Sequence, residues 1–501
     1  MFKCKQLLRR ICVVSYVFLL CGGLVNASNL VSKTNTLIGT QGNGWASGYL
    51  YPGATYPFGM VQFTPTYFTK QLGFVINQLS GAGCDHMGNF PTLPIAGALR
   101  VSPDSILNMQ TPVGKEIGTA GYYAATVDHS IRAELTVTER TGMARYTFSS
   151  KEKQGTVIIG GGVAATSIQV AAIKITGPHS CEGYAEGGAF CGIPTPYKVY
   201  FVAEFDADAE SFGTWKEERL HANHTFAEGS HSGVYFTFPL KEGNQAVQYK
   251  IGVSYVSVEN ARENLRVENP AWDFSAVRQA TQDKWNEYLG KIEVEGDNED
   301  RQMQFYTHLY RSLIHPNVCS DVNGEYMGAD SQVHKTARKF YTSFSNWDTY
   351  RTQTALIAML APEETSDIVM SHYLFAEQSG GGFPRWVLAN IETGVMQGDP
   401  TPILVANAYA FGARNYDPRT LLRTMRYGAE VPGANSQGVL TRPGLEQYLE
   451  KGYYDASILL EYTSSDFAIG RFALQACNDE PVCNWYTQRA MNWKNLFNKE
   501  T

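Results

Sequence analysis

The sequence has no excess of basic residues and little charge of either sign. Its 501 residues hold 41 Lys plus Arg against 48 Asp plus Glu, a formal net charge of −7, which argues against a general nucleic-acid binder. Charged residues make up only 18% of the chain and hydrophobic residues 44%, a composition too apolar for disorder. A chain of this length can bury more than one core, so we expect two or more domains.

Several motifs of familiar enzyme and cofactor sites are also missing. The chain has no GxSxG nucleophile motif, and Gly160-Gly161-Gly162 lacks the Lys and Ser/Thr of a phosphate-binding loop. Zinc sites need CxxC-like clusters or closely paired histidines, and His315, His334 and His372 do not have such spacing. A serine hydrolase, a nucleotide site and a zinc site are therefore all disfavoured.

A long apolar run occurs only at the amino terminus. Basic residues precede the run from Ile11 to Leu24, and Val25-Asn26-Ala27 offers small residues of the kind that a signal peptidase accepts. A membrane anchor is the alternative, but the run is shorter than the ~20 residues that a spanning helix needs. We expect residues 1–27 to be a signal peptide, with no membrane span, in a secreted or periplasmic protein.

Cysteine is sparse. Three of the nine cysteines lie within the expected signal peptide, which leaves an even six. Cys181 and Cys191, like Cys477 and Cys483, are close enough in sequence to close small loops, so these two pairs are our disulfide candidates. Spacing alone does not fix the connectivity.

The hydrophobic pattern changes near residue 260. Before that point the sequence reads as strands cut by Gly, Pro and Asn, and from Tyr249 to Val258 apolar residues recur at every second position. That period is typical of a strand with one buried face. Residues 28–259 are therefore predicted to form an antiparallel β-sandwich, with strands expected at 133–138, 145–148, 156–159, 198–205, 234–238 and 249–258.

From residue 260 the period becomes helical. Met303, Tyr306, Tyr310 and Leu313 fall on one face of a helix over 301–314. We expect linker helices over 260–300 and a helical domain over 301–501, either a toroid or a solenoid. Its further helices are predicted at 349–361, 363–377, 403–411, 418–427, 465–475 and 482–497.

Trp347, Asp348 and Arg351 form the first group of residues that could carry chemistry. A Trp can stack on the apolar face of a sugar ring while Asp and Arg bind its hydroxyl groups, so the group suits a carbohydrate pocket. The alternative is structural: Asp348 is a good N-cap for the following helix, and Trp347 can be a core residue.

A second group lies between two predicted helices. Trp386, Glu392 and Asp399 follow three consecutive glycines, in a loop position from which a scaffold often presents function. The alternative is that the glycines only permit turns and that Asp399 only begins a helix. Glycoside hydrolysis normally needs two carboxyl groups, which Asp348, Glu392 and Asp399 could supply, although their spacing does not show that they converge.

A series of longer blocks occurs in a fixed order along the chain. These blocks are Tyr51–Gln62, Leu79–Cys84, Thr138–Gly142, Phe305–Leu313, Trp347–Arg351 and Ala408–Gly412. Together they resemble glycoside hydrolase family 92, the calcium-dependent exo-acting alpha-mannosidases. The resemblance covers essentially the whole chain after residue 27.

The resemblance implies a β-sandwich followed by an (α/α)6 helical barrel, with the active site at their interface. It implies hydrolysis of terminal alpha-mannosides of N-glycans or mannans with inversion, aided by a calcium ion. Asp348 would be a mannose-binding carboxylate, and the aromatic and acidic residues from Gly380 to Asp399 would line the same pocket. The expected partner is a mannose-containing glycan.

The sequence also departs from the family pattern. The family's general-acid block, similar to Glu-Gly-Asn-Ala-Trp, and its general-base block, similar to Gly-Asn-Asp/Glu-Asp-Gly, are both absent. The catalytic residues are therefore unassigned, and the resemblance implies an incomplete barrel over 301–501 with an incomplete calcium site. We expect a truncated alpha-mannosidase product; the alternatives are half of a split enzyme completed by another chain and a non-catalytic glycan-binding protein.

Overall fold

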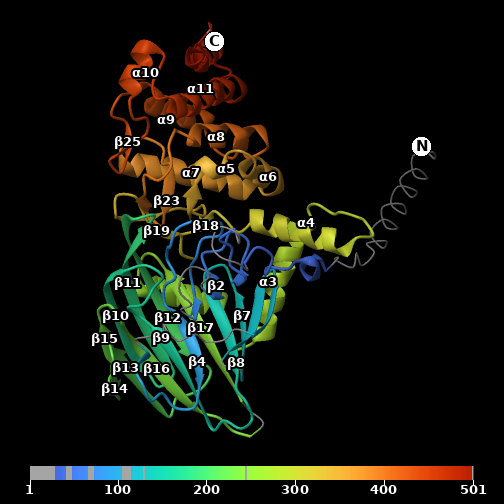
Figure 1. Cartoon of the computed structure of the whole chain (residues 1–501), viewed down its shortest axis with the longest axis vertical. Helices are drawn as coiled ribbons and strands as arrows, with labels where there is room; N and C mark the ends of the chain where they lie inside the picture. Colours follow the sequence, from blue (N-terminus) through green and yellow to red (C-terminus); the bar gives the residue numbers. More distant parts are fainter. Residues whose placement is uncertain are drawn as a thin grey trace, which may run out of the picture.

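The computed structural model describes residues 29–40, 48–65, 73–103, 114–127, 130–242, 245–498 and 500. The predicted signal peptide, residues 1–27, lies outside this part of the chain. Figure 1 shows two halves, a strand-rich half below and a helical half above that ends at the C-terminus. Within the described residues, no helix is long and apolar enough to cross a membrane.

The strand-rich half consists of two antiparallel sheets, as the alternating pattern predicts. The first sheet has the order β1 (Ala54–Thr55), β2 (Gln62–Pro65), β3 (Phe74–Val75), β4 (Thr92–Ala96), β9 (Gln154–Gly160), β16 (Ser232–Pro239), β13 (Ser211–Lys216), β14 (Arg219–Ala222). The second has the order β15 (Phe226–Glu228), β10 (Ile168–Gly177), β11 (Ser180–Phe190), β12 (Ile193–Phe205), β17 (Ala246–Ser254), β8 (Thr141–Thr147), β7 (Ile131–Val137), β6 (Tyr122–Val127), β5 (Gly114–Thr119).

The two sheets pack face to face through aromatic side chains. The ring of Phe205 on β12 lies 5.0 Å from Phe236 and 4.9 Å from Phe238 on β16, measured between ring centroids. All three rings are buried. The antiparallel sandwich expected from the sequence is therefore present.

Strand β17 differs from the prediction in two respects. It ends at Ser254, and Val258 already belongs to helix α2 (Val258–Glu268). Both faces of the strand are buried, because α2 covers the outer one: a Cβ at Gly252 would lie 2.3 Å from the Ala261 carbonyl oxygen. The one-sided burial predicted for this strand is therefore wrong, since periodicity within a strand does not reveal what packs on its polar face.

The helical half contains α3 (Phe274–Leu289), α4 (Glu299–Ser312), α5 (Asn346–Thr349), α6 (Gln353–Leu360), α7 (Pro362–Ser379), α8 (Thr401–Ala410), α9 (Pro418–Glu430), α10 (Leu445–Lys451), α11 (Ala456–Cys477), α12 (Glu480–Ala490) and the 3-10 helix η4 (Met491–Leu496). Another 3-10 helix, η1 (Leu30–Lys33), precedes the sandwich. Helix ends follow local signals: Asp455 caps α11 by accepting the backbone N–H groups of Ser457 and Ile458.

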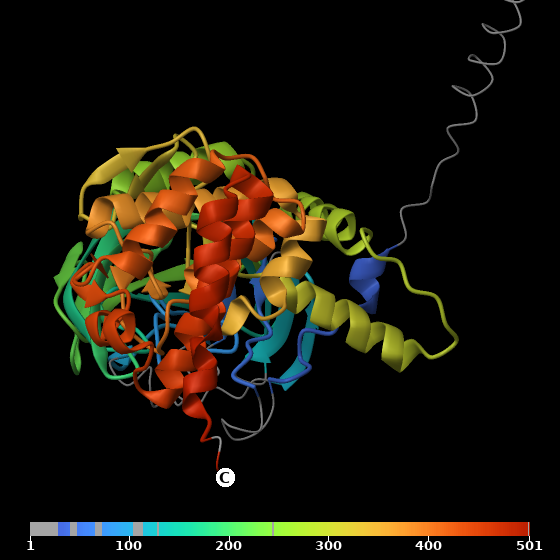
Figure 2. The same cartoon turned by 90° about the horizontal axis from the view of Figure 1, so that it is seen from above.

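Figure 2 shows α11, the long red helix, lying across the helical half, where it packs against α8, α9 and α12. The helices of the described chain do not close into a ring, which agrees with the expected incomplete barrel. Short antiparallel strand sets lie among the helices: β18 (Asn317–Val318) with β21 (Tyr341–Thr342), β19 (Glu325–Met327) with β20 (Val333–Lys335), β22 (Phe344–Ser345) with β23 (Trp386–Leu388) and β24 (Ile391–Glu392), and β25 (Asn435–Ser436) with β26 (Val439–Leu440).

The two halves are joined by buried contacts. The indole N–H of Trp285 on α3 donates to the Thr55 carbonyl on β1 at 2.7 Å. Backbone hydrogen bonds connect Phe58 with Leu313 at 2.9 Å and with Val318 at 2.8 Å. Trp386, from the helical half, belongs to the same apolar cluster as the sandwich core. These contacts hold the sandwich and the helical half in fixed positions on the two sides of any cavity at this junction.

Candidate functional site

A cavity of about 660 Å³ lies where the sandwich meets the helical half. Its sandwich wall includes residues 79–84, called loop 79–84 below, and the tip of the β11–β12 hairpin. Its helical wall includes Arg311 of α4, Asp348 of α5 and Trp386 of β23. This volume lies within the range of about 300–1,000 Å³ typical of small-molecule sites.

A buried histidine holds one end of loop 79–84. The Leu79 backbone N–H donates to His86 Nε2 at 2.8 Å. The Nδ1–H of the same ring donates to the Cys84 carbonyl at 2.7 Å, which assigns the tautomer. Complete burial lowers the pKa of His86 to about 4, so the ring is neutral near pH 7.

A second histidine holds the next residue of the loop in the same way. The Ser80 backbone N–H donates to His315 Nε2 at 2.9 Å. His315 Nδ1–H donates to Asn317 Oδ1 at 2.7 Å. Desolvation lowers the pKa of His315 to about 4 as well. Two neutral imidazoles therefore fix the loop backbone without placing a charge beside the cavity.

A disulfide connects loop 79–84 with the hairpin tip, and it corrects both predicted pairs. Cys191 bonds to Cys84, 107 residues away, whereas Cys181, Cys477 and Cys483 are buried free thiols. Cys181 lies near the start of β11 and Cys191 just beyond its end. Because a strand rises about 3.3 Å per residue, ten residues of strand separate them by roughly 33 Å. Cys181 and Cys191 are therefore close in sequence but far apart in space.

Asp348 and Trp386 both line the cavity, and neighbouring strands bring them there. Ser345 of β22 pairs with Trp386 of β23, and α5, which carries Asp348, follows directly. The Ser345 hydroxyl donates to the Asp348 carboxylate. Asp348 lies inside α5, whose N-cap is Ser345, so the alternative of an N-capping aspartate is wrong. Its side chain is exposed on the cavity wall.

Trp347 and Arg351 are not among the residues that line the cavity. The Trp347 indole N–H donates to Glu461 on α11 at 2.9 Å. The Arg351 guanidinium lies 4.8 Å from the centroid of the Trp347 ring and 3.7 Å from the Glu461 carboxylate. The observed contacts of these two residues tie α5 to α11. Their predicted contact with a sugar stays a prediction.

Glu392 is buried and faces the backbone of its own hairpin, not the cavity. Its carboxylate accepts N–H groups from Arg385 at 2.6 Å, Gly394 at 2.9 Å and Trp386 at 3.2 Å. Burial raises the pKa of this carboxyl group, while the N–H donors oppose the shift. Glu392 is not among the residues that line the cavity, and its predicted contact with a sugar stays a prediction. Glu392 holds the β23–β24 hairpin that presents Trp386.

Asp399 is likewise buried away from the cavity. It accepts from Arg442 Nε at 2.8 Å, and Arg442 Nη1 donates to Asp466 at 2.7 Å. Burial alone would lower the pKa of Arg442, but the carboxylates of Asp466 and Asp399 raise it overall. A buried ion-pair cluster thus joins the start of α8 to α11. Asp399 is not among the residues that line the cavity, and its predicted contact with a sugar stays a prediction.

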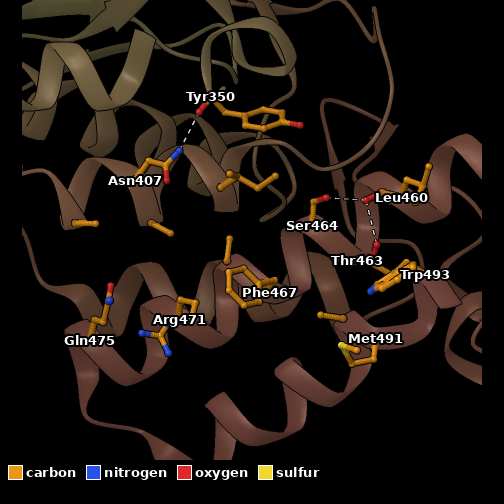
Figure 3. A pocket seen from close by; sticks show the side chains of 15 residues that line it. Tyr350, Asn407, Leu460, Thr463, Ser464, Phe467, Arg471, Gln475, Met491 and Trp493 are labelled. Atoms are coloured by element: carbon orange, nitrogen blue, oxygen red, sulfur yellow. Dashed lines mark hydrogen bonds between the residues drawn. The ribbon is translucent and has the colours of Figure 1, made fainter. Parts of the chain in front are cut away.

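A second hollow, of about 600 Å³, lies between α8, α11 and η4 and is shown in Figure 3. Its exposed side chains are mostly apolar: Phe467 is 53% exposed, Leu460 49% and Trp493 37%. Asn407 lines it and donates to the Tyr350 carbonyl at 2.9 Å, a contact drawn as a dashed line between these two labelled residues in Figure 3. Asp and Glu do not occur among its lining residues. Acid–base chemistry therefore favours the cavity between the halves.

The cavity walls do not supply a calcium cage. Calcium takes six to eight oxygen ligands, usually with several carboxylates. Among the lining residues that the structure describes, Asp348 is the only carboxylate. Across the described ranges, no group of three or more His, Cys, Asp or Glu side chains could hold a metal ion. The predicted calcium ion therefore does not fit these residues, and no reaction step is assigned to it.

Loop 79–84, His86, His315 and Phe190 were not identified as site residues from the sequence. The loop was noted only as a sequence block, and its small residues Ser80 to Gly83 were the available signal. His315 was set aside for lacking metal-ligand spacing, but its observed contact is with the loop backbone. A histidine that holds a loop by accepting a hydrogen bond from a backbone N–H has no characteristic spacing in the sequence.

Comparison with known proteins gives consistent matches. Residues 34–254 match the glycosyl hydrolase family 92 N-terminal domain, and residues 260–501 match the family's catalytic domain. An uncharacterized secreted glycosidase from Arthroderma benhamiae is 25% identical over 94% of this chain and 62% of its own length. The chain thus spans less than two thirds of that relative.

Two solved structures from Bacteroides thetaiotaomicron share the fold, each with a TM-score of 0.84. A family GH92 alpha-mannosidase is 24% identical, over 95% of this chain and 67% of its own. A family GH92 inverting mannosidase is 26% identical, over 94% of this chain and 65% of its own. The two domain matches together cover almost all of the described chain, in the order expected from the sequence. The chain belongs to glycoside hydrolase family 92.

Proposed function

We propose that the chain binds the terminal alpha-mannose of an N-glycan or mannan in the cavity between its two halves. One observation carries the proposal: the exposed carboxylate of Asp348 and the indole of Trp386 line the same cavity. An aromatic face suits the apolar side of a sugar, and a carboxylate suits its hydroxyl groups. The similarity to a B. thetaiotaomicron alpha-mannosidase that was solved with mannoimidazole supports mannose as that sugar.

The reaction that we propose for the complete site is inverting hydrolysis. Such hydrolysis uses two carboxyl groups about 6.5–9.5 Å apart, one to protonate the leaving oxygen and one to activate water. Asp348 is the single carboxylate among the described lining residues. We therefore assign to this chain the binding and orientation of the sugar, and turnover requires a second carboxyl group from outside these residues, as in an enzyme completed by another chain.

The single carboxylate also favours a second candidate, a glycan-binding protein without turnover. Calorimetric titration with mannoimidazole tests binding, and release of mannose from an aryl alpha-mannoside tests turnover. We expect binding by the wild type, weaker binding by Asp348→Asn and Trp386→Ala, and no release of mannose. Glu446→Gln, an exposed change on α10, is the matched control and should bind as the wild type does.

Three results would contradict this proposal. Failure of the wild-type chain to bind mannoimidazole would remove the mannose assignment. Binding that survives both cavity substitutions would place the sugar elsewhere. Inverting release of mannose by this chain alone would show that the chain already contains every catalytic group.

We also propose that the protein is exported, on the basis of its amino-terminal sequence and of the similarity to a secreted relative.

A further inference from the structure

The tip of the β11–β12 hairpin has an unusual backbone. Phe190 pairs with Ile193 across a two-residue turn, and both turn residues have positive φ, 51° at Cys191 and 80° at Gly192. Such turns favour Asn, Asp or Gly at both positions, because other side chains are strained there. A cysteine at the first position therefore calls for a reason outside the turn.

The contacts of Cys191 supply that reason. Its sulfur is bonded to Cys84 in loop 79–84, and both residues line the cavity. The hairpin tip is thus tied covalently to the loop that His86 and His315 hold. The turn conformation aims the Cys191 side chain at a fixed part of the cavity wall.

A register shift in β11 turns Phe190 inward. The pairing with β12 is irregular between Gly187 and Ala189, and Gly187 and Gly188 adopt φ values of 148° and 123° that other residues avoid. Strict alternation would place Phe190 on the outward face with Tyr184, six residues earlier. Burial along β11 instead changes phase at the two glycines, and the Phe190 side chain is buried.

Phe190 lies between the two walls of the cavity. Its ring stacks on Trp386 with centroids 4.2 Å apart and an interplanar angle of 28°. It meets the His86 ring edge-on at 6.2 Å. His86 holds the Leu79 N–H, and Glu392 holds the Trp386 N–H. The Phe190 ring thus contacts His86, which holds loop 79–84, on one side and Trp386 on the other.

We propose that Phe190 is a positioning residue that sets loop 79–84 and Trp386 at the spacing a sugar ring requires. The disulfide fixes the hairpin tip, and Phe190 transmits that position to Trp386. The identity of the sugar rests on the proposed function, whereas the coupling of the two walls does not.

Phe190→Ala and the milder Phe190→Leu test this role, and Tyr184→Ala is the matched control on the outer face of the same strand. Loss of the aromatic pair should weaken mannoimidazole binding about three- to tenfold. Peptide-level hydrogen exchange should rise in loop 79–84 and around Trp386. Phe190→Tyr should restore both properties, and Tyr184→Ala should change neither.

The two readouts separate the possible failures. Exchange and affinity that match the wild type in both Phe190 variants overturn the positioning role, as does faster exchange with unchanged affinity. If the wild type does not bind mannoimidazole, the proposed function fails, and the exchange of loop 79–84 alone decides whether Phe190 couples the walls. If Phe190→Ala does not fold, Phe190→Leu and the Cys84→Ser/Cys191→Ser pair give the same comparison.

Discussion

Replacing Glu392 by Gln should destabilise the protein without removing a contact to sugar. The carboxylate accepts three backbone N–H groups, from Arg385, Trp386 and Gly394. The amide keeps one acceptor oxygen and presents an NH2 group to at least one N–H that has lost its partner. A hydrogen bond to a charged group contributes about 1.5–3 kcal/mol, so we expect a loss of about 2 kcal/mol.

Thermal unfolding followed by circular dichroism measures this loss. For a domain of 150–250 residues, 1 kcal/mol shifts Tm by about 2–4 °C, so Glu392→Gln should lower Tm by about 4–8 °C. Glu446→Gln, at an exposed position of α10, should stay within about 0.5 kcal/mol of the wild type. Mannoimidazole affinity, measured well below Tm, should change far less in Glu392→Gln than in Asp348→Asn.

One result would refute this reasoning. If Glu392→Gln unfolds at the wild-type temperature and loses mannoimidazole binding, the carboxylate contacts the sugar directly. The hydrogen bonds to the β23–β24 hairpin would then not explain the role of Glu392, and the prediction that Glu392 binds substrate would be confirmed.

Three further outcomes are expected. Because the pKa of His86 is about 4 when folded and about 6.5 when unfolded, the unfolded chain binds the proton first, and His86 alone should lower stability by up to about 3 kcal/mol between pH 6.5 and 4. Burial lowers the pKa of His315 and His372 to about 4 as well, so in urea unfolding His86→Gln should make the slope shallower without removing it. Arg442→Met should cost about 3–5 kcal/mol in the same assay, since it leaves Asp399 and Asp466 buried without a counter-charge. Asp348→Asn should weaken mannoimidazole binding about ten- to a hundredfold in calorimetry, with Tm unchanged.

A different result would contradict each of these three predictions. An unchanged acid slope in His86→Gln would mean that other groups cause the loss of stability. A cost below about 1 kcal/mol in Arg442→Met would show that water reaches the carboxylates. Full affinity in Asp348→Asn would remove that carboxylate from the site.

The sequence predicted the two halves well, because hydrophobic period is a local property. The change from period two to a helical period near residue 260 lies at the actual boundary between β17 and α2. The helix start predicted at Pro418 also agrees with the structure, and the start predicted at Glu363 is one residue after the start of α7 at Pro362. The predicted helix over 349–361 was too long, because Thr352 leaves the helical conformation and α6 begins at Gln353.

The site was predicted only in part, because its residues meet through long-range contacts. Asp348 and Trp386 were named correctly as neighbours of one cavity, which followed from the resemblance to a family. Glu392 and Asp399 were chosen for their chemistry. The buried partner of Asp399 is Arg442, 43 residues further along the chain, and sequence spacing does not show this contact. The pairing of Cys84 with Cys191 depends on the path of β11, which sequence spacing does not show.

A crystal structure of the chain soaked with mannoimidazole tests the assignment of the cavity most directly. We expect the sugar ring between loop 79–84 and Trp386, with a hydroxyl group within hydrogen-bonding distance of Asp348. Density for the ligand at any other place, with this cavity filled only by solvent, would contradict the central claim.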